Sequence, residues 1–387
     1  MKRRKIIHIY NRSYDAYFPT EESEYYYLAG WSSAVARETM KYTDSYVIEN
    51  WRPERDVTKV TVREVQGIVC RLFPSLYSKH FGDLSIKMLR ELKIHTDKYE
   101  TLIHHSGIHC NSLRSLALLF KDTPIVAQHH GDLPPFVKFK QNGKPKLYLS
   151  HSAEKMLLSN IDHFFVLRKA EMEFLSLYAP NADVSLQTMG VDFDKFKPID
   201  KATSRKVLHF PPKKKIILYV GHFYNLKGVA LILETYKALQ RKHDIELVLV
   251  GGSQSDELYD EVVSTGARYY GMIPHDDLPL YYSAADVYLL PAFSSCYWGI
   301  DVTTIESLAC GTPIVSTTLR DFPTHEWRHL GVIPENENDV PRCVSSVLDN
   351  AHAYHNCRKV SQKYYDWRNI IRHTVMVYEN LFEEYYG

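Results

Sequence analysis

Short runs of β-branched and aromatic residues alternate with longer segments of helical periodicity along the whole chain. The runs predict strands over Ile6–Tyr10, Tyr46–Glu49, Leu102–His105, Ile125–Gln128, Phe164–Leu167, Ile216–Val220, Leu247–Val250, Val287–Leu290 and Ile314–Ser316. Apolar residues at helical spacing predict helices, as over Leu84–Leu92 and Leu113–Leu119. This alternation is typical of strand–helix–strand units, so it predicts an α/β fold class with parallel sheets.

The length of the chain and a break in the pattern predict two domains. A chain of 387 residues is too long for a single hydrophobic core, so two domains of roughly 150–200 residues are expected. A polar stretch, Lys201–Pro212, follows Gly190–Pro198 and precedes the strand Ile216–Val220. The seam lies near Gly190–Pro198, and we interpret this region with the polar stretch after it as a linker between two similar folds, an N-terminal domain, 1–198, and a second domain from 199 onward.

Composition narrows the classes of function. The chain has 47 Lys and Arg residues against 46 Asp and Glu residues, so no large net charge would draw it to nucleic acid. Its six cysteines form no CxxC pair, and its first residues lack the apolar segment of a signal peptide, which predicts a cytoplasmic protein. No run reaches the roughly 18–20 apolar residues of a spanning helix, so any membrane contact would be peripheral, at the inner face.

Two strand–loop–helix segments suit a phosphorylated ligand. After Val287–Leu290, Gly299 leads into a helix whose start is crowded by Asp301 and Thr303. Helix N-termini bind phosphate, and Glu306, a turn deeper, is placed to accept hydrogen bonds from both hydroxyls of a ribose. The simpler alternative makes Asp301 or Thr303 an N-cap and Glu306 an exposed helix residue.

The other segment is Leu218–Val229, in which Gly221 follows a strand and Lys227 is set to reach a diphosphate from a second side. Alone this segment would be weak evidence for a phosphate-binding site, because such loops are common in α/β proteins. Two anion-suited loops in one domain favour a dinucleotide-like ligand.

With these segments the second half resembles the retaining group 1 glycosyltransferases, or glycosyltransferase family 4, which have the GT-B fold. The resemblance rests on Lys227-Gly228, Gly251-Gly252, Gly271 ahead of Leu278–Tyr282, Ala285-Asp286-Val287 with Pro291, Glu306–Pro313, Gly190-Val191-Asp192, Phe196-Lys197-Pro198 and Asp366-Trp367. It implies two Rossmann-like domains that face each other across a cleft. The acceptor-side domain would be 1–198 and the nucleotide-sugar-binding domain 199–365, and a helix in 366–387 would cross back to the first domain.

The resemblance also assigns roles to particular residues. Lys227 would bind the donor diphosphate, and Glu306, as the second glutamate of an EX7E motif, would hold the ribose. The further donor-binding residues implied are Gly221, His222, Gly299, Ile300, Asp301, Val302 and Thr303.

Two positions depart from the family pattern. His222 stands where arginine is usual, so this diphosphate contact would be weaker or dependent on pH. The first glutamate of the motif is missing. Counting back eight residues from Glu306 reaches Trp298, whereas counting forward from Pro291 reaches Cys296, because the loop is longer than usual in the family. Asp301 is the carboxylate in this loop that can replace the missing glutamate. Its side chain would either contact the hydroxyls of the donor sugar or cap the helix that follows.

In the first half, His130 matches a histidine that faces the donor in many family members, and with Asp301 it is our candidate catalytic residue. His104, His105, His109 and His129 lie close by in sequence, which suggests a metal site. We nevertheless expect no metal and no cofactor, because strand-end histidines are more often hydrogen-bonded and the resemblance implies none. The candidate acceptor side comprises Gly30, Trp31 and His109, although the aromatic run before Gly30 is equally suited to packing.

We therefore expect a hexosyltransferase that moves a sugar from a nucleoside diphosphate sugar to a hydroxyl acceptor, with retention of configuration. The acceptor would be lipid-linked, a polysaccharide or a small molecule. The alternatives are a nucleotide-sugar epimerase on the same fold, which would need more acidic groups for proton transfer, and a non-catalytic relative. An assay of transfer, hydrolysis and epimerisation separates the three.

The basic loop Lys138–Lys146 generates a first prediction. If this loop contacts an anionic membrane, each lysine contributes about 1 kcal/mol and the chain should co-sediment with anionic but not neutral vesicles. Binding should disappear in high salt and when Lys138, Lys140, Lys144 and Lys146 become glutamine. Absence of binding to either vesicle type would favour the alternative, a solvated loop and a soluble acceptor.

Overall fold

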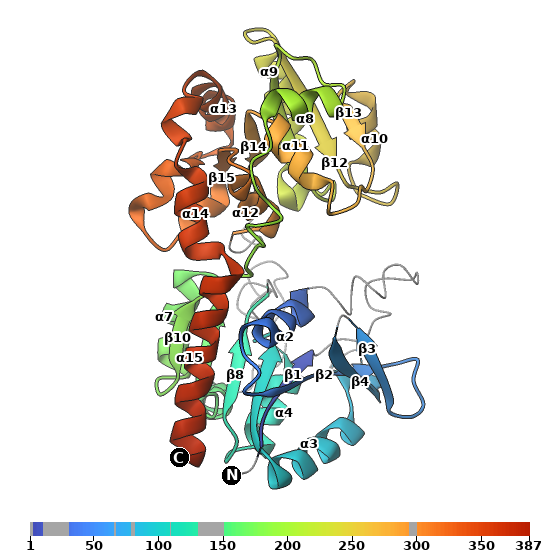
Figure 1. Cartoon of the computed structure of the whole chain (residues 1–387), viewed down its shortest axis with the longest axis vertical. Coiled ribbons are helices and arrows are strands. Elements are labelled where there is room, and N and C mark those ends of the chain that lie inside the picture. Colours follow the sequence, from blue (N-terminus) through green and yellow to red (C-terminus); the bar gives the residue numbers. More distant parts are fainter. Residues whose placement is uncertain are drawn as a thin grey trace. The chain divides into compact units, whose positions relative to one another are not determined.

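The chain folds into two compact units. The computed structural model describes residues 3–10, 31–65, 67–78, 82–108, 110–130, 151–293 and 300–387. Unit 1 comprises Met1–Met189 and Ile370–Gly387, and unit 2 comprises Gly190–Asn369 (Figure 1). The boundaries expected from the sequence lie after residue 198 and, from the family resemblance, after residue 365.

Unit 1 is built on a sheet with the strand order β10-β9-β8-β7-β1-β2-β4-β3. Its elements are β1 (Arg4–Tyr10), α2 (Trp31–Tyr42), β2 (Val47–Glu54), β3 (Thr61–Val65), β4 (Ile68–Pro74), β5 (Leu76–Ser78), β6 (Gly82–Leu84), α3 (Ile86–Lys98), β7 (Glu100–Ser106), α4 (Asn111–Leu119), β8 (Ile125–Gln128), α6 (His151–Leu158), β9 (His163–Val166), α7 (Lys169–Tyr178) and β10 (Asp183–Leu186). Within this sheet all neighbouring strands are parallel except β3 and β4, which form an antiparallel pair at the edge. The short strands β5 and β6 form a separate antiparallel pair. The predicted α/β class is confirmed, and the antiparallel edge is an addition that the alternation of elements did not indicate.

The two faces of this sheet carry different side chains. Ile7, Ile103 and Ile125 are paired across adjacent strands and pack in one apolar core with residues of α3, α4 and α7. Because side chains alternate along a strand, the next residues point to the opposite face. There His8, His104 and His163 lie in one row across the sheet, with Val126 between the last two.

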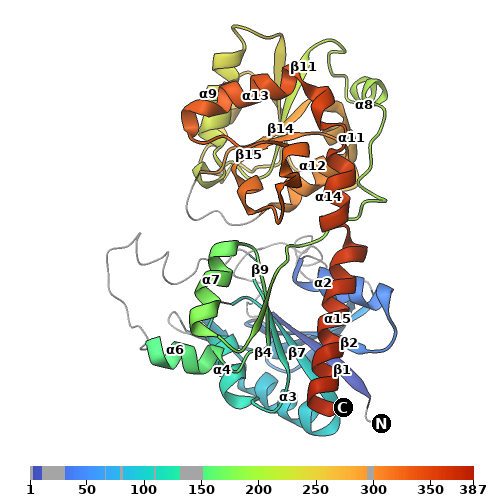
Figure 2. The same cartoon turned by 90° about the vertical axis from the view of Figure 1, so that its left-hand side faces the viewer.

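The long C-terminal helix α15 (Trp367–Tyr386) packs against this histidine-bearing face (Figures 1 and 2). The ring of His104 stacks on that of His8, with centroids 4.6 Å apart, and its Nδ1 lies 2.5 Å from the hydroxyl of Tyr378 on the helix. Gln187 joins the helix from the end of unit 1, because its amide donates to Thr374 at 3.0 Å. The predicted helix over Ile370–Phe382 is thus part of unit 1, to which Ile370–Gly387 belong.

Unit 2 contains a six-stranded parallel sheet with the order β13-β12-β11-β14-β15-β16. Its elements are α8 (Lys201–Val207), β11 (Lys215–Val220), η2 (Asn225–Lys227), α9 (Val229–Leu239), β12 (Ile245–Val250), α10 (Tyr259–Ser264), β13 (Arg268–Tyr270), α11 (Leu278–Ala284), β14 (Val287–Leu290), α12 (Val302–Ala309), β15 (Ile314–Ser316), η3 (Thr317–Asp321), η4 (His325–His329), β16 (Gly331–Val332), η5 (Glu337–Asp339), α13 (Val340–Asp349), η6 (Ala351–Tyr354) and α14 (Cys357–Tyr365). The central strands are buried on both faces, which explains why they read as continuous apolar runs in the sequence.

The stretch Lys201–Pro212, interpreted above as a linker, is an ordered part of unit 2. It contains α8, which begins at the N-cap Asp200. Arg205 on this helix is buried because its guanidinium pairs with Asp286 at 2.7 Å and donates to the carbonyl of Ala284 at 3.0 Å. The linker interpretation is therefore wrong: a polar helix packs here because its buried charge has a partner.

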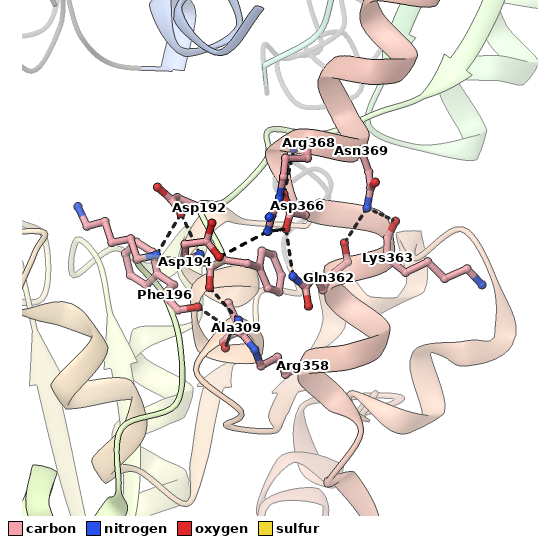
Figure 3. A network of polar contacts seen from close by, with 12 residues as sticks. Asp192, Asp194, Phe196, Ala309, Arg358, Gln362, Lys363, Asp366, Arg368 and Asn369 are labelled. Carbon is pink, nitrogen blue, oxygen red and sulfur yellow. Dashed lines mark hydrogen bonds and ion pairs between the residues drawn. The ribbon is translucent and has the colours of Figure 1, made fainter. Parts of the chain in front are cut away.

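The two segments that connect the units lie side by side within unit 2 (Figure 3). Val191 and Asp366 form an isolated parallel bridge, and a Cβ on Gly190 would lie 2.5 Å from the ring of Trp367. Arg358 donates to the carbonyls of Phe193 and Phe196, at 2.8 and 2.7 Å. Neither connecting segment can shift without disturbing hydrogen bonds of the other.

The histidine row of unit 1 generates a prediction about stability in acid. Burial lowers the pKa of His8 to about 3 and that of His163 to about 4, whereas an unfolded histidine titrates near 6.5. The folded form therefore excludes these protons, and stability that is complete above about pH 6.5 is lost as pH falls toward 4. For His163 alone the loss between about pH 6.5 and pH 5 is about 2 kcal/mol.

We expect His163→Phe to flatten the decline of the melting temperature between pH 6.5 and 5, above the range in which carboxylates titrate. The exposed His352 of unit 2 offers a matched control, His352→Phe, which should decline as the wild type does. Equal slopes for all three proteins would show that His163 does not couple protonation to unfolding.

Candidate functional site

The strand order of unit 2 changes direction at β11, which lies between β12 and β14. Connections leaving β11 and β14 at such a point run to opposite sides of the sheet, and ligands of open α/β sheets bind in the resulting crevice. The two segments singled out in the sequence are the connections that follow these two strands. The topology therefore places both anion-suited loops at the same edge.

Glycines allow two close approaches at this edge, one of them between the two connections. Gly228 has φ of +75°, and a Cβ there would lie 2.2 Å from the carbonyl oxygen of Pro291, the residue that follows β14. Gly221 has φ of +148°, and a Cβ there would lie 3.4 Å from Nζ of Lys227. At Gly228 any side chain would force the two connections apart.

Lys227 and the start of α12 are joined by an ion pair. Nζ of Lys227 lies 3.5 Å from Oδ2 of Asp301, while Oδ1 of Asp301 accepts hydrogen bonds from the amide and the hydroxyl of Thr303, both at 3.0 Å. Asp301 is thus the N-cap of α12, which supports the capping alternative for this residue. The lysine is held at the positive end of a helix, where an anion is bound most favourably.

Glu306 lies in the second turn of α12, and its side chain is 2% exposed. Its two carboxylate oxygens have different partners: Oε1 lies 2.7 Å from Nε2 of His275, and Oε2 accepts from the hydroxyl of Tyr282 at 2.9 Å. Burial raises the pKa of Tyr282 well above its usual range, so the phenol keeps its proton and donates. The alternative in which Glu306 is an exposed helix residue is wrong.

His222 is tied to a carboxylate. Its Nδ1 lies 3.2 Å from both oxygens of Asp256, and its ring stacks on Tyr224. Burial alone would raise the pKa of Asp256, but hydrogen bonds from the amide of Phe223, from Ser253 and from His222 together hold it below the usual range. Asp256 therefore shapes the loop after β11, and His222 is one of the groups that it orients.

The remaining residues predicted to bind the donor sugar nucleotide either offer only their backbone or lie outside the residues that the structure describes. The side chains of Ile300 and Val302 pack with the core of unit 2, so only their peptide groups are suited to a ligand. The hydroxyl of Thr303 lies 2.7 Å from that of Tyr288 on β14. Gly30, His109, Gly299, Cys296 and the loop Lys138–Lys146 lie outside the described residues, as does the side chain of Trp31.

The histidines of unit 1 do not converge. His104 faces α15, whereas His105 faces α4, with its Nδ1 2.8 Å from the carbonyl of Gly107 and its Nε2 2.7 Å from the hydroxyl of Ser112. His129 lies with Nδ1 2.6 Å from Glu171, and His130, two residues after β8, is close enough to lower the pKa of His8. Within the described part of the chain, no three His, Cys, Asp or Glu side chains are grouped to hold a metal ion.

Several residues of the site escaped the sequence interpretation. His275, Tyr282 and Asp256 lie in segments whose pattern indicates only loop or packed helix. Tyr282 belongs to the apolar face of α11, and nothing in its spacing reveals that its hydroxyl reaches α12. Such contacts join elements far apart in sequence, and periodicity carries no information about them.

The contacts of Asp301 predict how substitutions there affect stability. Asp301→Ala removes the cap of α12 and should lower the free energy of unfolding by about 1 kcal/mol, whereas Asp301→Asn keeps a capping oxygen and should lower it far less. Urea unfolding measures both, with Asp260→Ala at an exposed position of α10 as a control. Equal losses for both Asp301 variants would assign the stabilisation to the ion pair with Lys227 instead.

Comparison with known proteins bears on this geometry. Residues 214–350 match the family described as Glycosyl transferases group 1. An uncharacterized glycosyltransferase of Methanocaldococcus jannaschii is 28% identical over 192 residues, which cover 46% of this chain and 48% of that protein. D-inositol 3-phosphate glycosyltransferase 2 of Catenulispora acidiphila is 26% identical over 199 residues, 46% of each chain. The matched part thus spans about half the length of these curated relatives.

Solved structures are similar over nearly the whole chain. Sucrose-phosphate synthase from Thermosynechococcus elongatus aligns with a TM-score of 0.70 and 19% identity, covering 99% of this chain and 100% of that one. HepE of Anabaena, solved in complex with UDP, aligns with a TM-score of 0.68 and 14% identity, covering 97% and 100%. These similarities confirm the expected GT-B fold, and with the match over 214–350 they confirm the resemblance to the group 1 glycosyltransferases.

Proposed function

We propose that this chain transfers a glycosyl group from a nucleoside diphosphate sugar to a hydroxyl acceptor, with retention of the anomeric configuration. The observation that carries the proposal is the arrangement at the switch point of unit 2. There Lys227 is held at the first turn of α12, and the buried carboxylate of Glu306 lies one turn deeper in the same helix. A cation and a helix N-terminus beside a buried acceptor of hydrogen bonds suit a diphosphate joined to a ribose.

The proposed chemistry depends on charge. When the glycosidic bond to the diphosphate breaks, negative charge grows on the leaving phosphate, and Lys227 with the amides at the start of α12 would stabilise it. This is where a preorganised site contributes most, because the groups are already oriented by their protein contacts. The similarity in fold to HepE, which was solved in complex with UDP, supports a nucleotide as part of the ligand.

The acceptor and the stereochemistry rest on the resemblance. His130 would orient the donor sugar, and a sugar hydroxyl or a lipid-linked hydroxyl would attack on the face from which the diphosphate departs.

Within the described part of the chain, no helix combines the length and the apolar character that crossing a membrane requires.

Loss of either donor-binding side chain should weaken nucleotide binding. We expect Lys227→Ala and Glu306→Ala each to reduce the affinity for a nucleoside diphosphate by about 1.5–3 kcal/mol, the scale of one hydrogen bond to a charged group. Calorimetry measures this, and Lys237→Ala and Glu234→Ala on the exposed side of α9 are matched controls that should bind as the wild type does.

Activity is decided by a separate experiment. The wild type, incubated with a panel of nucleotide sugars and acceptors, should release nucleoside diphosphate and form a product with retained configuration. Unchanged affinity in both site variants would remove the proposed nucleotide site. Binding without transfer or hydrolysis would instead identify a non-catalytic relative, and interconversion of the sugar on its nucleotide would identify an epimerase.

A further inference from the structure

The surroundings of Glu306 point to a residue that controls how this carboxylate meets a ligand. An ionised carboxylate has about four lone-pair positions for hydrogen bonds, two on each oxygen. Here one position on each oxygen is occupied, by Tyr282 on Oε2 and by His275 on Oε1. One acceptor position therefore remains on each of two adjacent oxygens, an arrangement that matches the two hydroxyls of a cis-diol.

The tautomer of His275 follows from its second contact. Its Nδ1 lies 3.0 Å from Nζ of Lys195, and a lysine ammonium can only donate. Nδ1 therefore accepts, and the imidazole proton resides on Nε2, from which it is donated to Glu306. Lys195 is itself held by Asp276 at 2.5 Å, and the ring of His275 lies against that of Phe196, with centroids 5.0 Å apart.

His275 differs from Tyr282 in a way that matters for its role. Tyr282 is fully buried, and its hydroxyl satisfies a carboxylate that is also buried. The side chain of His275 is 56% exposed, so water could replace its hydrogen bond without leaving a buried group unpaired. The packing of the core therefore does not require the hydrogen bond from His275 to Glu306. What this hydrogen bond fixes is the orientation of the Glu306 carboxylate.

We propose that His275, oriented by Lys195, is a positioning residue that holds the Glu306 carboxylate in the rotamer in which its two remaining lone pairs face the 2′,3′-cis-diol of a ribonucleotide. The proposal rests on the proposed function and deepens it by adding to Glu306 a second residue on which recognition of the ribose depends. Selectivity for ribose over a sugar without these hydroxyls then depends on His275 as well as on Glu306. Lys195 precedes Phe196 in the segment that leads from unit 1 into unit 2, so this segment contributes to the orientation of Glu306.

Two substitutions separate positioning from packing. His275→Phe keeps a ring against Phe196 but removes the donor, whereas His275→Gln keeps a side-chain N–H that reaches Glu306. The probes are uridine, adenosine and guanosine diphosphates, each compared with its 2′,3′-dideoxy counterpart by calorimetry. His243→Phe is a matched control, because His243 bonds Ser345 elsewhere in unit 2.

We expect His275→Phe to weaken binding of the preferred ribonucleotide about tenfold, as for one charge-assisted hydrogen bond, and to leave its dideoxy counterpart within about twofold. His275→Gln should restore most of the ribonucleotide affinity, and Lys195→Met should weaken it in the same selective way. Melting temperatures of all variants near that of the wild type would show that the fold is intact.

Four results would overturn the proposal. Equal weakening of ribo and dideoxy ligands by His275→Phe would assign the residue to general packing, and tighter ribonucleotide binding by His275→Phe would make it a group that the ligand displaces. Unchanged binding by His275→Phe, with a wild type that binds, would remove the positioning role and leave the proposed function standing. A wild type that binds no ribonucleotide would remove both.

Discussion

The structure of unit 2 depends on one topological constraint, the reversal of strand order at β11. Because β12 lies on one side of this strand and β14 on the other, the connections after β11 and β14 diverge at a single edge of a fully parallel sheet. Gly228 then allows the backbone of one connection to contact Pro291 of the other. Every residue of the candidate site, from Lys227 to Glu306, takes its place from this arrangement.

Acidic side chains organise the site before any ligand is considered. Asp256 binds the loop after β11, Asp301 caps α12 and pairs with Lys227, and Glu306 accepts from Tyr282 and His275. Each carboxylate has its donors fixed by neighbouring segments of unit 2, loops as well as helices. A site whose charges are oriented in this way needs little rearrangement when it binds an anion, which is the condition for efficient electrostatic stabilisation.

Unit 1 contains a layer of buried polar side chains that are neutral instead of charged. Its histidine row is buried under α15, where burial keeps the pKa values of His8, His104 and His163 low and the imidazoles uncharged. The rings of His8 and His104 stack, and Nδ1 of His104 lies within hydrogen-bond distance of the hydroxyl of Tyr378. Of the histidines that suggest a metal site in the sequence, His104 belongs to this layer, whereas His105 faces α4, because successive residues of a strand face opposite sides of the sheet.

The sequence alone determined the α/β class and the predicted strands, because a buried parallel strand must be apolar along its length. Lys227, Asp301 and Glu306 are predicted as site residues because glycines, prolines and polar residues directly follow the strands that carry the loops, and because the family resemblance assigns them roles. Short edge strands such as Asp183–Leu186 and the polar helix Lys201–Val207 were not recognisable, since burial there depends on partners distant in the chain, as Arg205 depends on Asp286. Only the tertiary structure decided that Asp301 caps a helix, that His222 is tied to Asp256, and that His275 and Tyr282 hold Glu306, because each contact joins segments whose proximity is set by the packing of the sheet and its helices.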